Sequence, residues 1–219
     1  MGEKGFLERA AEEMWPRAKN KRELSGRPAR AVKKAGLLEL SEICRRVLYY
    51  FFDYPDEAIC LNDLAESVAA SKTSTREAVL LLEKHGHIKK EVIGNAWRIY
   101  AHNPNEFFFT ISKIPYNLQL IYESAILGTI YDKLPGAKAI ILFGSYRHGT
   151  NNKSSDVDIA VELAGDKALQ IVTLGTVNLG FRKNVKVNLH LFSRNKIDLN
   201  LFTNIANGIV LDGLLEVRP

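Results

Sequence analysis

The stretch of sequence that decides the fold is AIILFGS (residues 139–145), followed by the ten residues of a polar loop (146–155) and then by DVDIAVE (156–162). The first run is apolar and predicts a buried strand that ends in a Gly-Ser turn, whereas the second alternates between polar and apolar residues. Because neighbouring side chains of a strand point to opposite faces, we expect Asp156 and Asp158 on one face and Val157 on the other. The pattern therefore predicts two carboxylates on one face of a strand, close to the turn.

Two carboxylates beside a small turn suit a divalent cation that carries a triphosphate. Hard cations such as Mg²⁺ bind carboxylate and phosphate oxygens. A turn at Gly144 and Ser145 lets backbone N–H groups approach phosphates, and a helix that begins there adds its positive end. The cations of the following loop are either nucleotide-binding residues or a solvated surface: Arg147, His148 and Lys153. The alternative to a cation site is a polar hairpin with two solvated aspartates.

The combination of an apolar strand, a Gly-Ser turn, a spacer of ten residues and an Asp-Val-Asp strand resembles the DNA polymerase β-like nucleotidyltransferase superfamily, in its minimal nucleotidyltransferase branch. The resemblance covers residues 106–219. It implies an α+β core in which helices flank a mixed sheet. It also implies that Asp156 and Asp158 are catalytic and hold Mg²⁺, and that Gly144 and Ser145 bind ATP or another nucleoside triphosphate.

The next predicted strand, VKVNLHL (185–191), departs from that family at one position. Active members usually supply a third acidic residue there. The alternation of the strand places Asn188 at that point, with Lys186 and His190 on the same face. An asparagine oxygen is neutral, so Asn188 coordinates a cation weakly and cannot accept a proton at neutral pH. We count Asn188 among the catalytic candidates, but the sequence supports a nucleotide site better than turnover.

Around these strands, the pattern predicts helices over residues 107–134, 165–179 and 196–207 and a last short strand at 209–211. Strands and helices in this order are typical of an α+β core. We expect this domain to span residues 104–219.

Residues 37–103 are expected to form a separate domain. Ser41 predicts the start of a first helix, a second helix follows over 62–70, and Ser74 with Glu77 predicts a capping box at the start of a third. A hairpin then turns at Gly94. This order resembles a winged helix-turn-helix, which implies that the third helix and the hairpin contact DNA, although such modules also bind proteins. The residues expected to face DNA are Lys72, Thr73, Thr75, Arg76, Lys89 and Lys90, and Arg98 is expected beside the hairpin.

The net charge of +5 comes from residues 1–36, which hold ten Lys and Arg against five Asp and Glu. We interpret this segment as a basic helical arm and linker that either binds nucleic acid phosphates or extends into solvent. The apolar residues between Phe6 and Trp15 recur with a helical period. They require a partner surface, either in a homodimer or on the next domain.

No apolar run approaches the ~20 residues of a membrane span, and no signal-peptide pattern opens the chain. The two cysteines, Cys44 and Cys60, lack a metal-binding spacing. These features favour a cytoplasmic protein with no membrane partner.

Two main functions are compatible with these patterns, and an interaction scaffold with neither activity is a third alternative. The first is an enzyme that transfers a nucleoside monophosphate, AMP in the first place, from Mg²⁺-NTP to an acceptor, with a DNA-binding winged helix attached. The resemblance to minimal nucleotidyltransferase antitoxins implies a protein acceptor such as a HEPN-type toxin, and the family also modifies small molecules and RNA. The second is a DNA-binding transcriptional regulator whose degenerate nucleotidyltransferase domain senses nucleotide or mediates association. Asn188 favours the second function, and the two aspartates favour the first.

Overall fold

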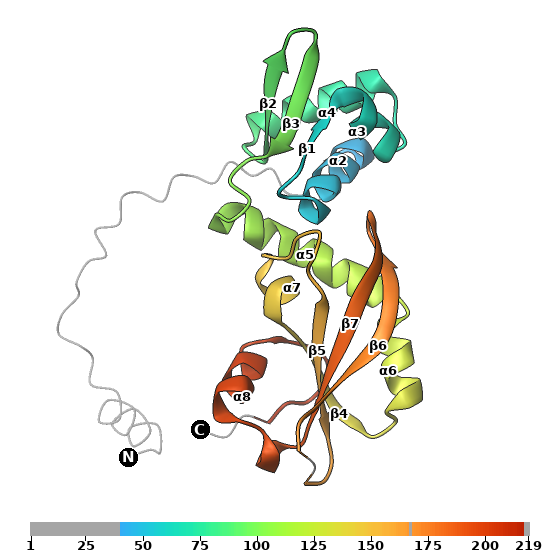
Figure 1. Cartoon of the computed structure of the whole chain (residues 1–219), viewed down its shortest axis with the longest axis vertical. Helices are drawn as coiled ribbons and strands as arrows, with labels where there is room; N and C mark the ends of the chain where they lie inside the picture. The colour runs from blue at the N-terminus through green and yellow to red at the C-terminus, as the bar shows by residue number, and fades with distance from the viewer. Residues whose placement is uncertain (1–39, 167, 217–219) are drawn as a thin grey trace, which may run out of the picture. The chain divides into compact units, whose positions relative to one another are not determined.

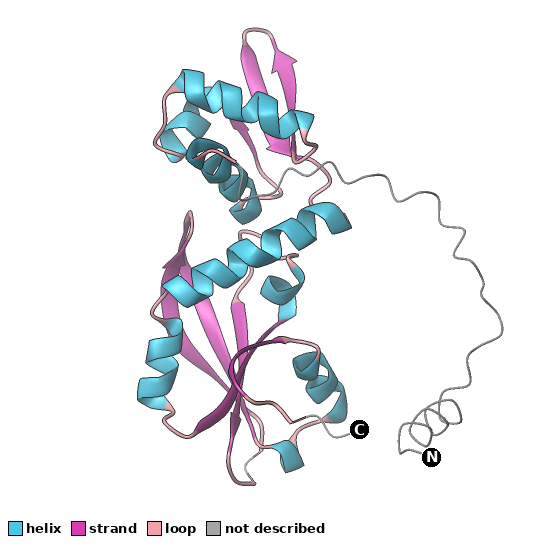
Figure 2. Cartoon of the chain, turned by 180° about the vertical axis from the view of Figure 1, so that it is seen from behind, coloured by secondary structure: helices cyan, strands magenta, loops and turns pink. Residues whose placement is uncertain are grey.

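The computed structural model describes residues 40–166 and 168–216 of the chain (Figures 1 and 2). The basic arm predicted over residues 1–36 lies outside the described residues. Within the described ranges, no helix combines the length and the apolar character needed to cross a bilayer. The first elements in chain order are α2 (Glu42–Asp53), β1 (Ala58–Cys60), α3 (Leu61–Ser67), α4 (Lys72–Lys84), β2 (Ile88–Ile93) and β3 (Ala96–Ala101).

These six elements form what we call the helical unit (residues 40–101), whose small antiparallel sheet has the order β1-β3-β2. The prediction for its first helix is confirmed. Ser41 is the N-cap of α2, and its hydroxyl accepts a hydrogen bond from the backbone N–H of Cys44 at 3.3 Å. Side chains of α2, α4 and β3, including Phe51, Leu82 and Ile99, are fully buried in one core. Burial of these large apolar groups is the main force that holds the unit together.

The third helix begins earlier than predicted. Ser71, not Ser74, is the N-cap of α4, because its hydroxyl accepts a hydrogen bond from the backbone N–H of Ser74 at 3.1 Å. Ser74 therefore lies inside the first turn, and the predicted capping box is wrong. Thr75 lies three and four residues before Ala78 and Val79, and all three side chains are on the buried face of the helix.

The second part of the fold is a sheet with flanking helices. Its elements are α5 (Phe107–Glu123), α6 (Ile126–Lys133), β4 (Ala137–Phe143), α7 (Gly144–His148), β5 (Val157–Leu163), β6 (Gln170–Leu179), β7 (Arg182–Phe192), the short helix η2 (Arg194–Lys196), α8 (Leu199–Ala206) and β8 (Ile209–Gly213). The strand order is β6-β7-β5-β4-β8. Only β5 and β7 run parallel in this sheet, so it is mixed, as expected for the predicted α+β core.

The segment 165–179, predicted as a helix, instead contains the edge strand β6. Its sequence QIVTLGTVNL is rich in β-branched residues, which lose side-chain freedom in a helix and pack well on a pleated sheet. β6 pairs antiparallel with β7, and the register shifts next to Gly175, whose φ is +145°. A glycine at such a bulge relieves the backbone where the pairing is interrupted. The helix prediction is therefore wrong.

The two faces of the sheet pack against different helices (Figures 1 and 2). α5 and α6 cover the face of Ile159, which packs with Ile126. α8 covers part of the other face, where Ile205 packs with Ala160. Because side chains alternate along β5, Asp158 lies on the same face as Ala160, and it stays partly exposed there.

Candidate active site

The Gly-Ser turn lies directly against Asp158. The register of β4 and β5 sets Phe143 opposite Asp158, and the chain passes from β4 into α7 at Gly144, with Ser145 in the first turn. Gly144 has a φ of +69°, and a Cβ at this position would lie 3.0 Å from Asp158 Oδ2. Glycine is therefore required here both for the left-handed backbone and for the space beside the carboxylate.

Asp156, Asp158 and Asn188 meet across β5 and β7. The parallel register places Asp158 beside Asn188. Asn188 Nδ2 donates to Asp156 Oδ2 at 3.2 Å and to Asp158 Oδ1 at 3.4 Å. The three side chains expected to form the site are thus adjacent, and a single amide bridges both carboxylates.

Two further side chains of β7 contact the aspartates. Lys186 Nζ lies 4.0 Å from Asp156 Oδ2, and His190 Nε2 lies 3.4 Å from Asp158 Oδ1. The His190 ring stands edge-on to Phe143, with 4.8 Å between the ring centres. The alternation of β7 placed Lys186 and His190 on the correct face, but it gave no indication that each contacts a carboxylate. The cluster therefore combines two carboxylates, an ammonium, an imidazole and an amide.

This cluster suits one hard divalent cation. The side chains of Asp156 and Asp158 are 40% and 30% exposed, so a cation with attached phosphates can reach both from solvent. Asn188 can offer only a neutral oxygen. Within residues 40–166 and 168–216, no group of three or more His, Cys, Asp and Glu side chains has the arrangement of a metal centre. Phosphate and water oxygens would complete the coordination, as is usual for Mg²⁺.

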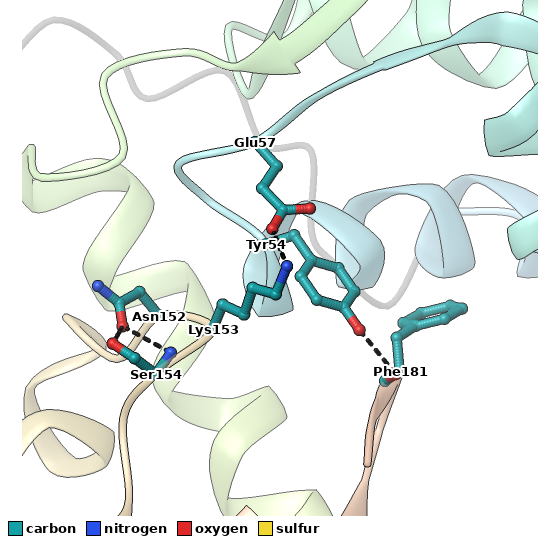
Figure 3. A network of polar contacts seen from close by, with 6 residues as sticks. All are labelled: Tyr54, Glu57, Asn152, Lys153, Ser154 and Phe181. Carbon is teal, nitrogen blue, oxygen red and sulfur yellow. Dashed lines mark hydrogen bonds and ion pairs between the residues drawn. The ribbon is translucent and has the colours of Figure 1, made fainter.

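The cations of the loop after the turn have partners of their own. Arg147 Nε donates to the carbonyl of Asn207 at 2.8 Å. Lys153 forms an ion pair of 2.7 Å with Glu57 of the helical unit (Figure 3). The structure thus directs Lys153 toward the helical unit, and not toward a nucleotide at the carboxylates. The pair of Lys153 and Glu57 is an exposed ion pair, and such pairs contribute little stability.

The residues predicted to face DNA differ in their exposure. Those with exposed side chains are Lys72, Thr73, Arg76 and Lys89. Thr75 is fully buried, and its hydroxyl donates to the carbonyl of Ser71 at 2.9 Å, so the prediction that it faces DNA is wrong. Lys90 forms an ion pair with Glu83.

Trp97 lies beside the residues predicted to face DNA, and its sequence context does not predict this position. Arg76 Cζ lies 5.4 Å and Lys90 Nζ 5.3 Å from the centre of its ring, within the range of cation–π contacts. A cavity of about 290 Å³ opens beside them, and its lining includes Lys72 and Asn95. We call this region, between the start of α4 and the β2–β3 hairpin, the α4–hairpin surface.

Comparison with known proteins finds a similarity to nucleotidyltransferases in one part of the chain. Residues 124–203 match the family described as Nucleotidyltransferase domain. A protein adenylyltransferase of Shewanella oneidensis, MntA, is 45% identical over 49 residues, which cover 22% of this chain. The matched segment spans about a third (34%) of the length of that relative. The part of the chain that holds Gly144, Asp156, Asp158 and Asn188 is therefore similar to nucleotidyltransferase domains.

Proposed function

We propose that this chain is a nucleotidyltransferase that transfers a nucleoside monophosphate, AMP in the first instance, from a nucleoside triphosphate to an acceptor. The observation that carries the proposal is the meeting of Asp156 and Asp158 beside Gly144. In the reaction, a hydroxyl oxygen of the acceptor forms a bond to the α-phosphorus. The bond from that phosphorus to the bridging oxygen breaks, pyrophosphate leaves, and the proton of the acceptor passes to solvent.

Each residue of the site has a distinct role in this proposal. Asp156 and Asp158 would hold Mg²⁺, which supplies positive charge to the triphosphate. Asn188 keeps the two carboxylates at a fixed separation through its two hydrogen bonds. Lys186, with a side chain that is 49% exposed, adds a positive charge beside Asp156. Phosphoryl transfer depends mainly on positioning and charge, and these contacts provide both.

We propose a protein as the acceptor. The relative from Shewanella oneidensis carries the name protein adenylyltransferase. The resemblance to minimal nucleotidyltransferase antitoxins points to a HEPN-type toxin as one such acceptor.

We further propose that residues 37–103 are a DNA-binding winged helix-turn-helix domain, joined to a nucleotidyltransferase domain of residues 104–219. In support, α3, α4 and the β2–β3 hairpin follow one another in the order of such domains. The exposed cations Lys72, Arg76 and Lys89 would contact DNA phosphates, and the basic residues 1–36 would add to the attraction.

A second candidate function is a DNA-binding regulator in which the nucleotidyltransferase-like domain binds nucleotide without turnover. The observation that favours it is Asn188, because the amide removes the third negative charge that a second cation needs. Losing one such charged group costs about 10²–10³ in rate. The two candidates differ in whether the α-phosphate becomes attached to an acceptor.

The two functions can be separated with ATP labelled at the α-phosphate. Purified protein is incubated with Mg²⁺ and labelled ATP, with and without lysate of a bacterial cell, beside an Asp156→Ala variant. The enzyme predicts label on a macromolecule and release of pyrophosphate, both lost in the variant. Nucleotide binding without label transfer, with transfer gained by Asn188→Asp, would select the regulator instead. Absence of both binding and transfer in every variant would contradict both candidates.

A further inference from the structure

Arg182, the first residue of β7, connects two segments of the candidate active site, the Gly-Ser turn and the strand of the aspartates. Its side chain is buried, with 6% of the residue exposed. Nη1 donates to the hydroxyl of Tyr146 at 2.6 Å, and Nη2 donates to the carbonyl of Ser155 at 2.6 Å. Tyr146 directly follows the Gly-Ser turn, and Ser155 directly precedes Asp156. One guanidinium therefore connects the residue that follows the turn with the residue that precedes Asp156.

Side chains of α5 hold the loop between these two segments. Asn117 Nδ2 donates to the carbonyl of Tyr146 at 2.8 Å and to Asn151 Oδ1 at 2.8 Å. Lys113 donates to the carbonyl of Asn151. Asn117, Asn151 and Lys113 are each no more than 1% exposed. Because buried polar groups are costly when unpaired, these contacts fix the path of the loop and leave Arg182 as its link to β7.

The last residue of α2 and the C-cap that follows it, Asp53 and Tyr54, hold the tight turn between β6 and β7. Asp53 Oδ2 accepts a hydrogen bond from the backbone N–H of Phe181 at 2.8 Å, and the hydroxyl of Tyr54 donates to the carbonyl of Phe181 at 2.9 Å (Figure 3). The hydroxyl of Tyr116 donates to the same oxygen of Asp53 at 2.8 Å. At Gly180 the φ is +59°, and a Cβ would lie 2.4 Å from Asp53 Oδ2. The turn therefore approaches the carboxylate as closely as only glycine allows.

Burial of the Asp53 carboxylate costs free energy, which indicates that its hydrogen bonds serve to hold the turn. Asp53 is 2% exposed, and within the described part of the chain it forms no ion pair. Burial raises the pKa of Asp53 to about 6, although the hydrogen bonds from Phe181 and Tyr116 act in the opposite direction. An apolar side chain would avoid this cost but would leave the N–H of Phe181 unpaired.

We propose that Arg182 is a positioning residue for nucleotidyl transfer, and that Asp53 and Tyr54 place it, so that the helical unit sets the geometry of the active site. The inference rests on the proposed function and adds to it a route of control. Binding of DNA to the helical unit would act on the aspartates through α2, the turn at Phe181 and the guanidinium of Arg182.

Substitution of Arg182 tests the positioning role. Arg182→Lys keeps the positive charge but cannot hold two acceptors in one planar fork. We expect it to lower kcat at least tenfold, with less than a threefold change in KM for ATP. Arg182→Ala is expected to regain part of its kcat in millimolar guanidinium, and not in NaCl. The matched control is Arg194→Lys at the other end of β5, where Arg194 pairs with Glu162 at 3.0 Å, and its kcat should equal that of the wild type. A kcat of Arg182→Lys within twofold of the wild type would overturn the proposal.

Hydrogen exchange followed by mass spectrometry tests the same claim without reference to activity. Arg182→Lys and Tyr54→Phe are both expected to speed exchange in residues 144–158 at least tenfold, while Arg194→Lys leaves it unchanged. Tyr54→Phe removes only one hydroxyl, so it keeps the test valid even where an Arg182 variant folds poorly. Failure of the wild type to transfer label would contradict the proposed function alone. Unchanged exchange in Tyr54→Phe and Arg182→Lys would overturn the positioning role, whether or not the wild type is active.

Discussion

The candidate active site and the α4–hairpin surface both gather polar side chains, but they do so differently. At the active site, Asn188 lies 3.2 and 3.4 Å from the two aspartates, on strands whose register is fixed. On the α4–hairpin surface, Arg76 lies more than 5 Å from the ring centre of Trp97 and stays exposed. Groups held at hydrogen-bond distance support chemistry that depends on placement, whereas dispersed charge supports binding. Substitutions should therefore change rates strongly at the first region and affinities weakly at the second.

Removal of one carboxylate should give the largest effect. Asp158→Ala is expected to lower transfer of label from α-labelled ATP by about 10³-fold, because it removes a charged group that we propose positions the cation and the phosphates. Asp132→Ala, which removes an exposed carboxylate of α6, is the matched control and should transfer label at the wild-type rate. A loss of less than tenfold in Asp158→Ala would mean that the two regions do not differ as the geometry indicates.

The next effect concerns stability and pH. Burial lowers the pKa of Lys113 from 10.5 to about 7. The unfolded chain therefore binds one more proton than the folded chain between these values, and stability rises with pH across that window. We expect the free energy of unfolding of the wild type to rise by about 2 kcal/mol between pH 7 and pH 9, relative to that of Lys113→Met. Urea unfolding at each pH provides the measurement. A difference that is constant with pH would show that the polar contacts behind the active site do not bury this amine.

The two regions can also be compared by adding one methyl group to a glycine in each of them. Gly144 and Gly94 have φ values of +69° and +59°, but a Cβ on Gly94 would meet nothing within 4 Å. Alanine at either position should cost about 1 kcal/mol of stability. Only Gly144→Ala should slow label transfer, by about tenfold, because the new methyl group displaces Asp158 Oδ2. Equal transfer rates in the two variants would remove the steric role assigned to Gly144.

The smallest effect is expected on the α4–hairpin surface. Arg76→Ala should weaken DNA binding about fivefold, since one expected phosphate contact is lost. The slope of log affinity against log salt concentration should become shallower by about one unit. Arg98→Ala is the matched control, because Arg98 is also exposed but already pairs with Glu91 at 3.0 Å. Titration of labelled duplex DNA at several salt concentrations provides the measurement. Equal losses in Arg76→Ala and Arg98→Ala would mean that the charge is not directed toward DNA.

The parts of this fold that were predictable from the sequence depend on neighbours along the chain. Alternation placed Asp156 and Asp158 on one face, and the spacing to Gly144 indicated that the turn returns to them. The helix predicted over 165–179 was wrong because this segment pairs with β7 as the strand β6, and β-branched residues favour such pairing. Thr75 was misplaced because it was grouped with the exposed first turn, although its spacing of three and four residues from Ala78 and Val79 puts it on the buried face of α4.

The contacts behind the active site were not predictable for a different reason. Phe181 and Asp53 are 128 residues apart, and Lys153 and Glu57 are 96 apart. No periodicity connects such positions, so only the folded chain brings them together. No sequence pattern pointed to Arg182, although it contacts Tyr146 and Ser155, which flank the Gly-Ser turn and Asp156 in the motif.

Asp156 and Asp158 are proposed to hold the metal–nucleotide complex beside Gly144. Diffraction at the manganese absorption edge from crystals soaked with Mn²⁺ and a non-hydrolysable ATP analogue tests it most directly. We predict one anomalous peak at bonding distance from both carboxylates, with the triphosphate extending toward Gly144. A nucleotide bound elsewhere, or a manganese peak away from both carboxylates, would contradict the account.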